Sequence, residues 1–268
     1  MKKINGFLFS FILIFMIFNQ KSQSMGINFI KKKSVITKVK YDKVQVNKLE
    51  DIYVERKGDF VFSELNIDLR NLSVSKRKDV FIRLMIPSIN IVHKEIQNNK
   101  KIISILKEKK KYTLEEEKYL KDIFKKYKVK FGDFKTLESK MVIYPTSLIL
   151  AQGGLESAWG TSRFFREGNN AFGIWSSSKA EPRIAAKSSR KTFTAHLRSY
   201  ETLKETVEDI CMLVSRADAY KNLRYYINEG KNVYEIAEGL IRYSEEGKVY
   251  IKKIKGTLKY NDLEKYDK

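Results

Sequence analysis

Apolar residues recur at helical spacing along most of the chain, whereas they alternate with polar residues in its early part. Residues 25–74 alternate in places, so we predict an extended linker or short strands there. Between residues 75 and 140 the spacing becomes helical, and Pro87 is expected to kink or divide the first helix. Thr113 followed by Glu116 is a capping box, which predicts the start of a second helix. We expect residues 75–140 to form a helical N-terminal region.

The second half of the chain repeats the helical pattern around one interruption. Pro145 predicts the start of a helix that runs to Gly160, where a glycine ends it. Residues 168–199 are rich in glycine, serine and β-forming residues, which predicts a small sheet or an ordered loop. Polar capping residues predict the starts of three later helices, at Thr202, Asn232 and Ser244. The pattern predicts a mainly α (α+β) fold, in which residues 141–260 form a helical domain with a small β-rich insertion.

Residues 1–24 have the layout of a secretory signal peptide. Two lysines precede an apolar run over residues 7–18, and the small residues at 22 and 24 form a cleavage site. The run is short for a bilayer span, which needs roughly 20 residues. We therefore expect export to the periplasm or cell envelope, with retention by an uncleaved N-terminal anchor as the alternative. Export excludes intracellular nucleic acid as a partner.

Positive charge is concentrated in the first half of the chain. The 268 residues carry a net charge of +21, of which +3 falls in residues 1–24, +13 in residues 25–140 and +5 in residues 141–268. The lysine-rich stretches of the first half are interpreted as solvated helix faces, and the functional alternative is weak, non-specific association with an anionic envelope surface. One cysteine excludes an internal disulfide and two histidines do not suggest a zinc site, so we expect no metal and no cofactor. We also expect a monomer.

Residues 144–175 concentrate the groups that a sugar-binding cleft needs. They contain both tryptophans and five of the thirteen glycines, which combines rigid aromatic faces with permissive backbone. Glu156 lies near the predicted helix end, where the helix dipole and apolar neighbours disfavour a carboxylate. Both effects favour the neutral acid, the form that protonates a leaving-group oxygen. The alternative is an exposed helix glutamate without a catalytic role.

The stretch LAQGGLESAWGTSRFFREGNNAFGIW resembles the bacterial Bax-type proteins, which belong with the peptidoglycan β-N-acetylglucosaminidases. That group lies in the lysozyme-like superfamily, near glycoside hydrolase family seventy-three. Two later segments, AYKNLR and GLIRYSEEGKVYIKKI, fit the same family, so the resemblance extends over residues 142–258. It implies a lysozyme-like catalytic domain and an exported endo-β-N-acetylglucosaminidase that hydrolyses the glycan strands of peptidoglycan, its expected partner.

The resemblance also implies roles for individual residues. Glu156 matches the catalytic general acid, and Tyr243 matches a tyrosine that is expected to position the reacting sugar or water. Five more residues match motif positions around the substrate groove: Trp159, Asn169, Asn170, Phe172 and Trp175.

These five residues are expected to differ in what they do. We expect Trp175, and with it Phe172, to offer stacking faces to sugar rings. Asn169 or Asn170 is expected to hold the loop or the substrate by hydrogen bonds. For Trp159 and Phe172 the alternative is plain core packing.

The sequence leaves two candidates for the nucleophile or base that acts together with the general acid. Hydrolysis by paired carboxylates needs a second Asp or Glu, and Glu181, Glu245 and Glu246 are the candidates. An N-acetylated sugar can instead use its own acetamido oxygen as the nucleophile. Two other functions also compete with hydrolysis: a lytic transglycosylase on the same polymer, and a cell-wall-binding protein without catalytic activity.

Overall fold

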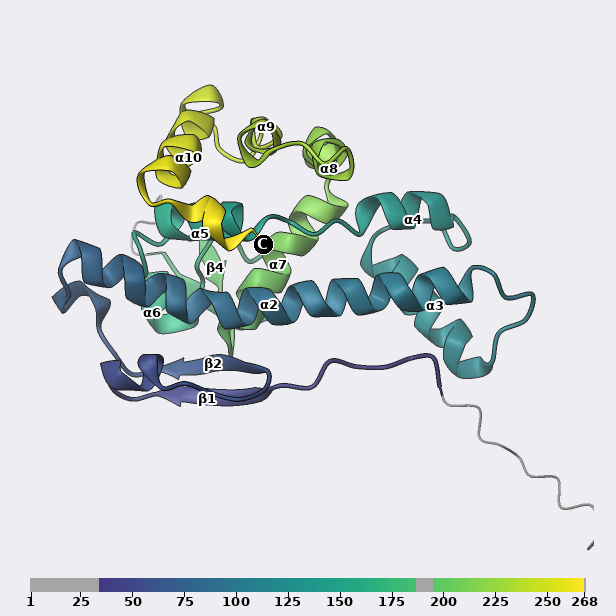
Figure 1. Ribbon diagram of the computed structural model, residues 1–268, viewed down its shortest axis with the longest axis horizontal. Helices are drawn as coiled ribbons and strands as arrows, with labels where there is room; N and C mark the ends of the chain where they lie inside the picture. Colours follow the sequence, from purple (N-terminus) through teal and green to yellow (C-terminus); the bar gives the residue numbers. More distant parts are fainter. Residues whose placement is uncertain (1–33, 187–194, 268) are drawn as a thin grey trace, which may run out of the picture. The chain divides into compact units, whose positions relative to one another are not determined.

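The computed structural model of the chain describes residues 34–186 and 195–267, and within them residues 36–267 belong to one compact unit (Figure 1). The predicted signal peptide lies outside the described residues. The helices are α2 (Val74–Leu106), α3 (Leu114–Lys126), α4 (Phe134–Lys140), α5 (Thr146–Glu156), α6 (Arg163–Gly168), α7 (Leu203–Arg216), α8 (Lys221–Asn228), α9 (Val233–Glu238) and α10 (Lys248–Tyr260). The strands are β1 (Asp42–Val46), β2 (Phe60–Leu65), β3 (Arg183–Ala185) and β4 (His196–Arg198). Short 3-10 turns are η1 (Leu49–Tyr53), η2 (Leu69–Asn71), η3 (Asp218–Tyr220) and η4 (Leu263–Tyr266). The predicted mainly α class with small β elements is confirmed.

Helix α2 is the longest element, with 33 residues, and it runs unbroken through Pro87. Of the two predicted effects of Pro87, a kink or a division of the helix, the division does not occur. A proline removes one backbone hydrogen bond, but Leu84, Met85 and Ile89 on either side of it are fully buried in the same core. Burial of these side chains outweighs the loss of one bond, because each contributes about 1.5–3 kcal/mol.

The stretch predicted to hold short strands contains β1 and β2, which pair in parallel. The turn η1 lies between them in the chain and lets the second strand run in the same direction as the first. Strand β2 packs against α2 and α7 and buries Val61 and Phe62. Helices from both sides of residue 140, α2 on one side and α5 and α7 on the other, share one hydrophobic core.

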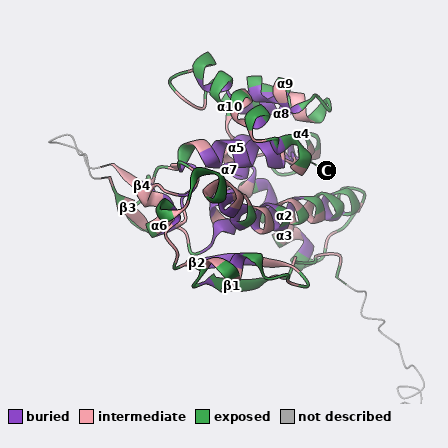
Figure 2. Ribbon diagram, turned by 60° about the vertical axis from the view of Figure 1, so that its left-hand side comes forward, coloured by how far each residue is buried: buried purple, intermediate pink, exposed green. Residues whose placement is uncertain are grey.

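Helix α5 is the central helix of this core, since every residue from Thr146 to Gly154 is buried (Figure 2). It contacts α2, α9, α10 and η4. Pro145 is its N-cap rather than part of its first turn. The helix ends at Glu156, four residues before the predicted end at Gly160.

The later helices follow their capping signals only in part. Asn232 and Glu235 form the predicted capping box of α9, and Thr113 and Glu116 form that of α3. Helix α7 starts after Thr202 as predicted, although the Thr202 side chain makes no capping bond. Helix α10 begins at Lys248 instead of directly after Ser244, because the intervening residues form turns.

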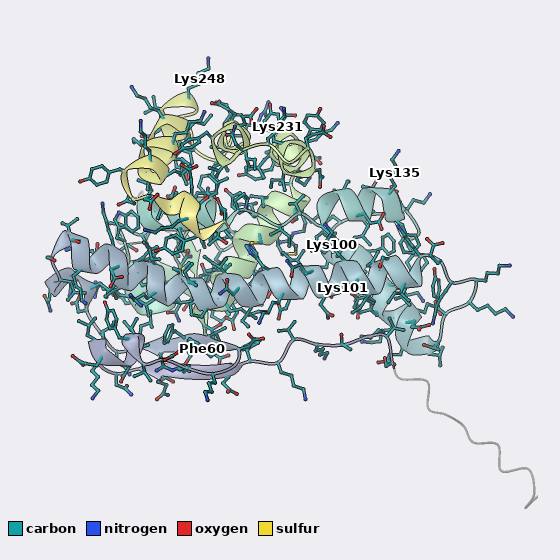
Figure 3. All side chains as sticks on the ribbon, viewed as in Figure 1. Phe60, Lys100, Lys101, Lys135, Lys231 and Lys248 are labelled. Atoms are coloured by element: carbon teal, nitrogen blue, oxygen red, sulfur yellow. The ribbon has the colours of Figure 1, made fainter. Side chains whose placement is uncertain are left out.

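The predicted β-rich insertion is present as the antiparallel pair β3 and β4, extended by a bridge between Trp175 and Leu197. None of the helices within the described ranges is long and apolar enough to cross a bilayer. The lysines labelled in Figure 3 are all exposed on the outside of the helices and turns: Lys100, Lys101, Lys135, Lys231 and Lys248.

Candidate active site

A groove of about 490 Å³ opens where the end of α5 meets β4, α7 and the turn that precedes α10. Four of the predicted site residues line it: Glu156, Phe172, Trp175 and Tyr243. These residues are spread over 88 positions of the chain, so only the tertiary fold brings them together. The groove therefore brings the predicted general acid together with three of the predicted aromatic site residues.

Glu156 is held at the groove by the way in which α5 ends. It is the last helical residue, and Ser157 follows it as the C-cap. The Ser157 hydroxyl donates to the Gly153 carbonyl at 2.5 Å and accepts from the Gly160 amide at 2.9 Å. These bonds close the turn tightly. Glu156 consequently sits at the carbonyl end of the helix, where the dipole disfavours a negative charge.

The turn after Glu156 also carries backbone strain. Ala158 and Trp159 both have left-handed conformations, with φ of 49° and 56°. Non-glycine residues in that region cost of order 1–3 kcal/mol each, and such strain clusters at functional sites. The strained turn ends the helix before the predicted position, and it leaves the Glu156 side chain exposed in the groove.

The surroundings of Glu156 favour its protonated form. Although the Glu156 side chain is exposed in the groove, the protein atoms around its carboxyl partly remove it from water, and this desolvation raises its pKa. The nearby charge of Glu246 raises the pKa further. A hydrogen bond from Tyr250 and the charge of Lys253 act in the opposite direction, but the pKa stays above its ordinary value. A raised pKa favours the neutral acid, which is the form that a general acid needs.

Behind Glu156 lies a row of buried polar groups. The Tyr250 hydroxyl donates to Glu156 Oε1 at 2.9 Å. Tyr250 in turn accepts from Gln152 Nε2 at 3.2 Å, and Gln152 Oε1 accepts from the Tyr144 hydroxyl at 2.5 Å. Tyr144 and Gln152 are fully buried, and Tyr250 is nearly so. Because burying an unpaired polar group is costly, these groups depend on one another for their partners.

Tyr243 combines a position in the groove wall with contacts to the same network. Its hydroxyl donates to the Phe172 carbonyl at 3.2 Å. Its ring stacks on Tyr250, with centroids 5.2 Å apart and an interplanar angle of 19°. Tyr243 therefore contacts Tyr250, the residue that donates a hydrogen bond to Glu156.

Trp175 and Phe172 both line the groove, but in different ways. The Trp175 side chain is exposed, with 63% of its surface accessible, while its backbone bridges to Leu197. Phe172 is 3% exposed, and its ring lies so close to Gly153 that an added Cβ there would stand 3.3 Å from it. Trp175 has a free face for a ligand, whereas Phe172 is mainly packed into the core.

Trp159 does not lie on the groove. Its ring meets the edge of Phe81 at 5.7 Å between centroids and also covers Gly154, where an added Cβ would come within 3.0 Å. Lys78 lies over the same ring. These contacts are the ones that the core-packing alternative for Trp159 expects, since the ring is partly buried against the core.

The two asparagines hold the protein rather than facing the groove. Asn169 caps α6 in a left-handed conformation and donates to the carbonyls of Tyr200 and Glu201. Asn170 is 1% exposed, and its Nδ2 donates to the carbonyls of Ile174 and Arg198. Its Oδ1 accepts from the Ile174 amide. Of the two predicted roles, holding the loop is the one that these contacts serve.

None of the predicted partner carboxylates lines the groove with Glu156. Glu181 accepts hydrogen bonds from the Ser176 hydroxyl and from the backbone amides of Ser177 and Ser178. It also pairs with Arg198 at 3.2 Å. These bonds lower the pKa of Glu181, so its carboxylate stays charged and holds its loop together through hydrogen bonds. Glu246 is bound by Lys253 at 2.7 Å, and Glu245 is exposed outside the groove lining.

The structure adds residues that the sequence did not indicate. Asp209 of α7 lines the groove, paired with Arg198 at 2.5 Å and accepting from the Tyr200 hydroxyl at 2.7 Å. Arg198, Asp209 and Arg216 also line an adjoining cavity of about 750 Å³. Among the described residues, no cluster of three or more His, Cys, Asp or Glu side chains could hold a metal ion.

Some of these residues left a signal in the sequence and some did not. Gln152 is a polar residue in the middle of an apolar helical run, which marks a buried hydrogen-bonding group. Asp209 lies on an amphipathic helix, and no neighbouring residue in the sequence distinguishes it from a solvent-exposed acid.

The chain is similar in sequence to known glucosaminidases and related proteins. A family profile for Glucosaminidase, described as mannosyl-glycoprotein endo-beta-N-acetylglucosaminidase, matches residues 132–263. The chain is 33% identical over 114 residues to Protein bax of Escherichia coli (strain K12), which covers 40% of this chain and 42% of that protein. It is 31% identical over 144 residues to Exo-glucosaminidase LytG of Bacillus subtilis (strain 168), which covers 51% of this chain and 50% of that protein. The chain thus spans about half the length of the curated relatives it matches.

The chain also has some similarity to solved structures, at lower sequence identity. The catalytic domain of the autolysin Auto from Listeria monocytogenes is 19% identical, covers 64% of this chain and 96% of its own, and has a TM-score of 0.40. A peptidoglycan hydrolase from Sphingomonas sp. A1 is 22% identical, covers 49% of this chain and 84% of its own, and has a TM-score of 0.36.

Proposed function

Because residues 132–263 belong to the glucosaminidase family of glycoside hydrolases, we propose that this chain is an endo-β-N-acetylglucosaminidase acting on peptidoglycan, with Glu156 as general acid. The observation that carries the proposal is the position of Glu156: a glutamic acid with a raised pKa, at the carbonyl end of a buried helix, facing a groove. The name of one relative, an exo-glucosaminidase, supports a glucosaminidase activity.

In the proposed reaction Glu156 gives its proton to the bridging glycosidic oxygen. The bond between that oxygen and the anomeric carbon breaks, the electron pair stays with the oxygen, and the leaving sugar departs as a neutral alcohol. Trp175 stacks on a sugar ring beside the cleaved bond, and Tyr243 orients the sugar or the attacking water.

As the nucleophile of the proposed reaction we favour the acetamido oxygen of the substrate. Asp209 shares the groove lining with Glu156, but Arg198 and Tyr200 already bind its carboxylate. Glu181 and Glu246 are likewise engaged by cations outside the lining. An internal nucleophile needs no free carboxylate, and water then opens the cyclic intermediate.

An internal cut, rather than removal of terminal sugars, is supported by the extent of the site. The groove and the adjoining cavity share Arg198, Asp209 and Arg216, so the hollow surface extends beyond the groove itself. A polymer can then occupy both sides of the cleaved bond. A substrate in the cell wall also fits the proposed export to the envelope, with weak attraction of the basic first half to anionic polymers.

The decisive experiment is digestion of purified peptidoglycan by the wild type, by Glu156→Gln and by a matched control, Glu167→Gln. Glu167 is an exposed acid of the same segment that pairs with Arg163. Loss of a general acid lowers the rate by about 10²–10⁴, so Glu156→Gln should be nearly inactive and Glu167→Gln fully active. Equal digestion by Glu156→Gln would refute the assignment.

Mass spectrometry of the products separates the competing functions. Reducing N-acetylglucosamine ends and large early fragments are expected of the proposed enzyme. Anhydro-muramic ends would instead identify a lytic transglycosylase, and release of small terminal sugars would identify an exo-enzyme. Binding of peptidoglycan without any cleavage by the wild type would identify a cell-wall-binding protein.

A further inference from the structure

The buried row of polar groups behind Glu156 has a direction. We propose that Tyr144, Gln152 and Tyr250 form a polarised hydrogen-bond relay that reserves Oε1 of Glu156 as an acceptor and so places the catalytic proton on Oε2. This inference rests on the proposed function, because it assigns positioning residues to the same general acid. The three residues lie outside the groove lining and act on the substrate only through Glu156.

The direction follows from what each group can donate. Gln152 Nε2 has only hydrogens to offer, so the Tyr250 oxygen must accept at that contact, 3.2 Å long. The Tyr250 hydrogen then points to its other neighbour, Glu156 Oε1, at 2.9 Å. At the far end the Tyr144 hydroxyl donates to Gln152 Oε1 and fixes the orientation of the amide.

Burial makes this orientation persistent. Tyr144 and Gln152 are 0% exposed and Tyr250 is 4% exposed, so water cannot replace a lost partner readily. Gln152 and Glu156 are one turn apart on α5 and therefore lie on the same face of that helix. Both reach the hydroxyl of Tyr250, which α10 supplies from the other side.

The relay has two consequences for the acid. Since Oε1 already accepts the Tyr250 hydrogen, the carboxyl proton resides on Oε2, which is left for the glycosidic oxygen. As that proton leaves, Glu156 becomes a carboxylate, and the Tyr250 bond becomes charge-assisted and stronger. A contact that strengthens during the reaction stabilises the transition state more than the ground state.

The first test is Tyr250→Phe, which keeps the ring and removes the hydroxyl. Because the Tyr250 bond lowers the pKa of Glu156, its loss should move the alkaline limb of the kcat/KM profile to higher pH. At the optimum kcat should fall about tenfold or more while KM changes less than about twofold, the pattern of a lost transition-state contact. General damage to the fold would lower activity without moving the limb upward.

The second test removes the other members of the relay. Gln152→Met deprives Tyr250 of its donor, and combining it with Tyr144→Phe leaves no buried hydroxyl without a partner. This double variant should lower kcat as Tyr250→Phe does, and adding Tyr250→Phe to it should cost little more. Full additivity of the losses would overturn the relay, because independent contacts add.

A control and a direct measurement complete the design. Tyr119→Phe removes a hydroxyl that donates to Asn99 at 2.9 Å on another pair of helices, and it should leave both kcat and the limb unchanged. Carbon NMR titration of the Glu156 carboxyl reports its pKa without any turnover. The pKa should rise in Tyr250→Phe; an unchanged value would overturn the relay, and a lowered value would show the reverse direction, with Glu156 donating to Tyr250.

These readouts separate the two proposals. If Glu156→Gln digests peptidoglycan as well as the wild type, the proposed function fails, while the NMR titration still tests the relay. If Glu156→Gln is inactive but neither Tyr250→Phe nor the double variant changes the pH profile or the titration, the function stands and the relay fails.

Discussion

The ring of Tyr243 stacks on the ring of Tyr250, with centroids 5.2 Å apart and planes inclined by 19°. Tyr243 lines the groove, and Tyr250 donates a hydrogen bond to Glu156. The stack therefore connects the wall that a sugar would touch to the side chain that holds the proposed acid. The hydroxyl of Tyr243 has a separate contact, with the Phe172 carbonyl.

Ring and hydroxyl of Tyr243 can be tested apart. Tyr243→Phe keeps the stack, so we expect kcat/KM to fall by less than about tenfold, the cost of one hydrogen bond. Tyr243→Leu loses the stack as well and should cost about 100-fold, because Tyr250 and Glu156 lose their lateral support. Rates of reducing-end release measure both. Equal losses in the two variants would assign the effect to the hydroxyl alone.

The two tryptophans should respond differently to substitution. Trp175→Ala removes the exposed face in the groove, and KM for glycan strands should rise about tenfold with little change in kcat, as expected for a lost stacking contact. Trp159→Phe should instead lower the melting temperature and leave KM unchanged, because that ring packs against Phe81. An unaltered KM in Trp175→Ala would remove Trp175 from the substrate site.

The raised pKa of Glu156 links stability to pH. Above the ordinary carboxyl pKa near 4.5, folding forces a charged Glu156 into surroundings that disfavour it, and the penalty is complete once the pH exceeds the folded pKa. Glu156→Gln should therefore raise the melting temperature at pH 7, by no more than about 3 °C because the side chain is exposed. The gain should vanish in acid, below both pKa values. Calorimetry at both pH values checks this, and a gain that persists in acid would contradict it.

The charge of Glu246 raises the pKa of Glu156, so its removal should act in a defined direction. Glu246→Gln should move the alkaline limb of the activity profile to lower pH, while activity in the acidic range changes less than about tenfold. Glu245→Gln, a neighbouring exposed acid, should move nothing. A loss as large as that of Glu156→Gln would make Glu246 the second catalytic carboxylate and refute substrate assistance.

The close approach of α8 to the residue after α9 depends on Gly239. A Cβ there would stand 2.4 Å from the Leu223 Cα, which is backbone and cannot move aside. Gly239→Ala should destabilise the protein by about 2–3 kcal/mol or more through overpacking. Gly256→Ala, on α10 with nothing within 4 Å, should be neutral or stabilise by up to about 1 kcal/mol. Chemical denaturation of the two variants provides the comparison, and similar stabilities would contradict it.

Much of the fold was predictable because its signals are local. The capping boxes of α3 and α9 each lie within four consecutive residues, so the backbone there is determined before any long-range contact forms. The end of α5 was not predictable in this way. Leu155 and Trp159 continue the apolar spacing, but the turn at Ala158 and Trp159 adopts a left-handed backbone that only the surrounding packing sustains.

The sequence by itself determined the helical class, the position of Glu156 near a helix end and the aromatic groups beside it, since all three depend on neighbours a few residues away. Only the tertiary structure decided which tryptophan faces the groove, that Asp209 shares it, and that Tyr250, 94 residues further along, donates to Glu156. The reason is physical: the burial of a side chain and the partner of a hydrogen bond depend on segments that meet only when the core closes.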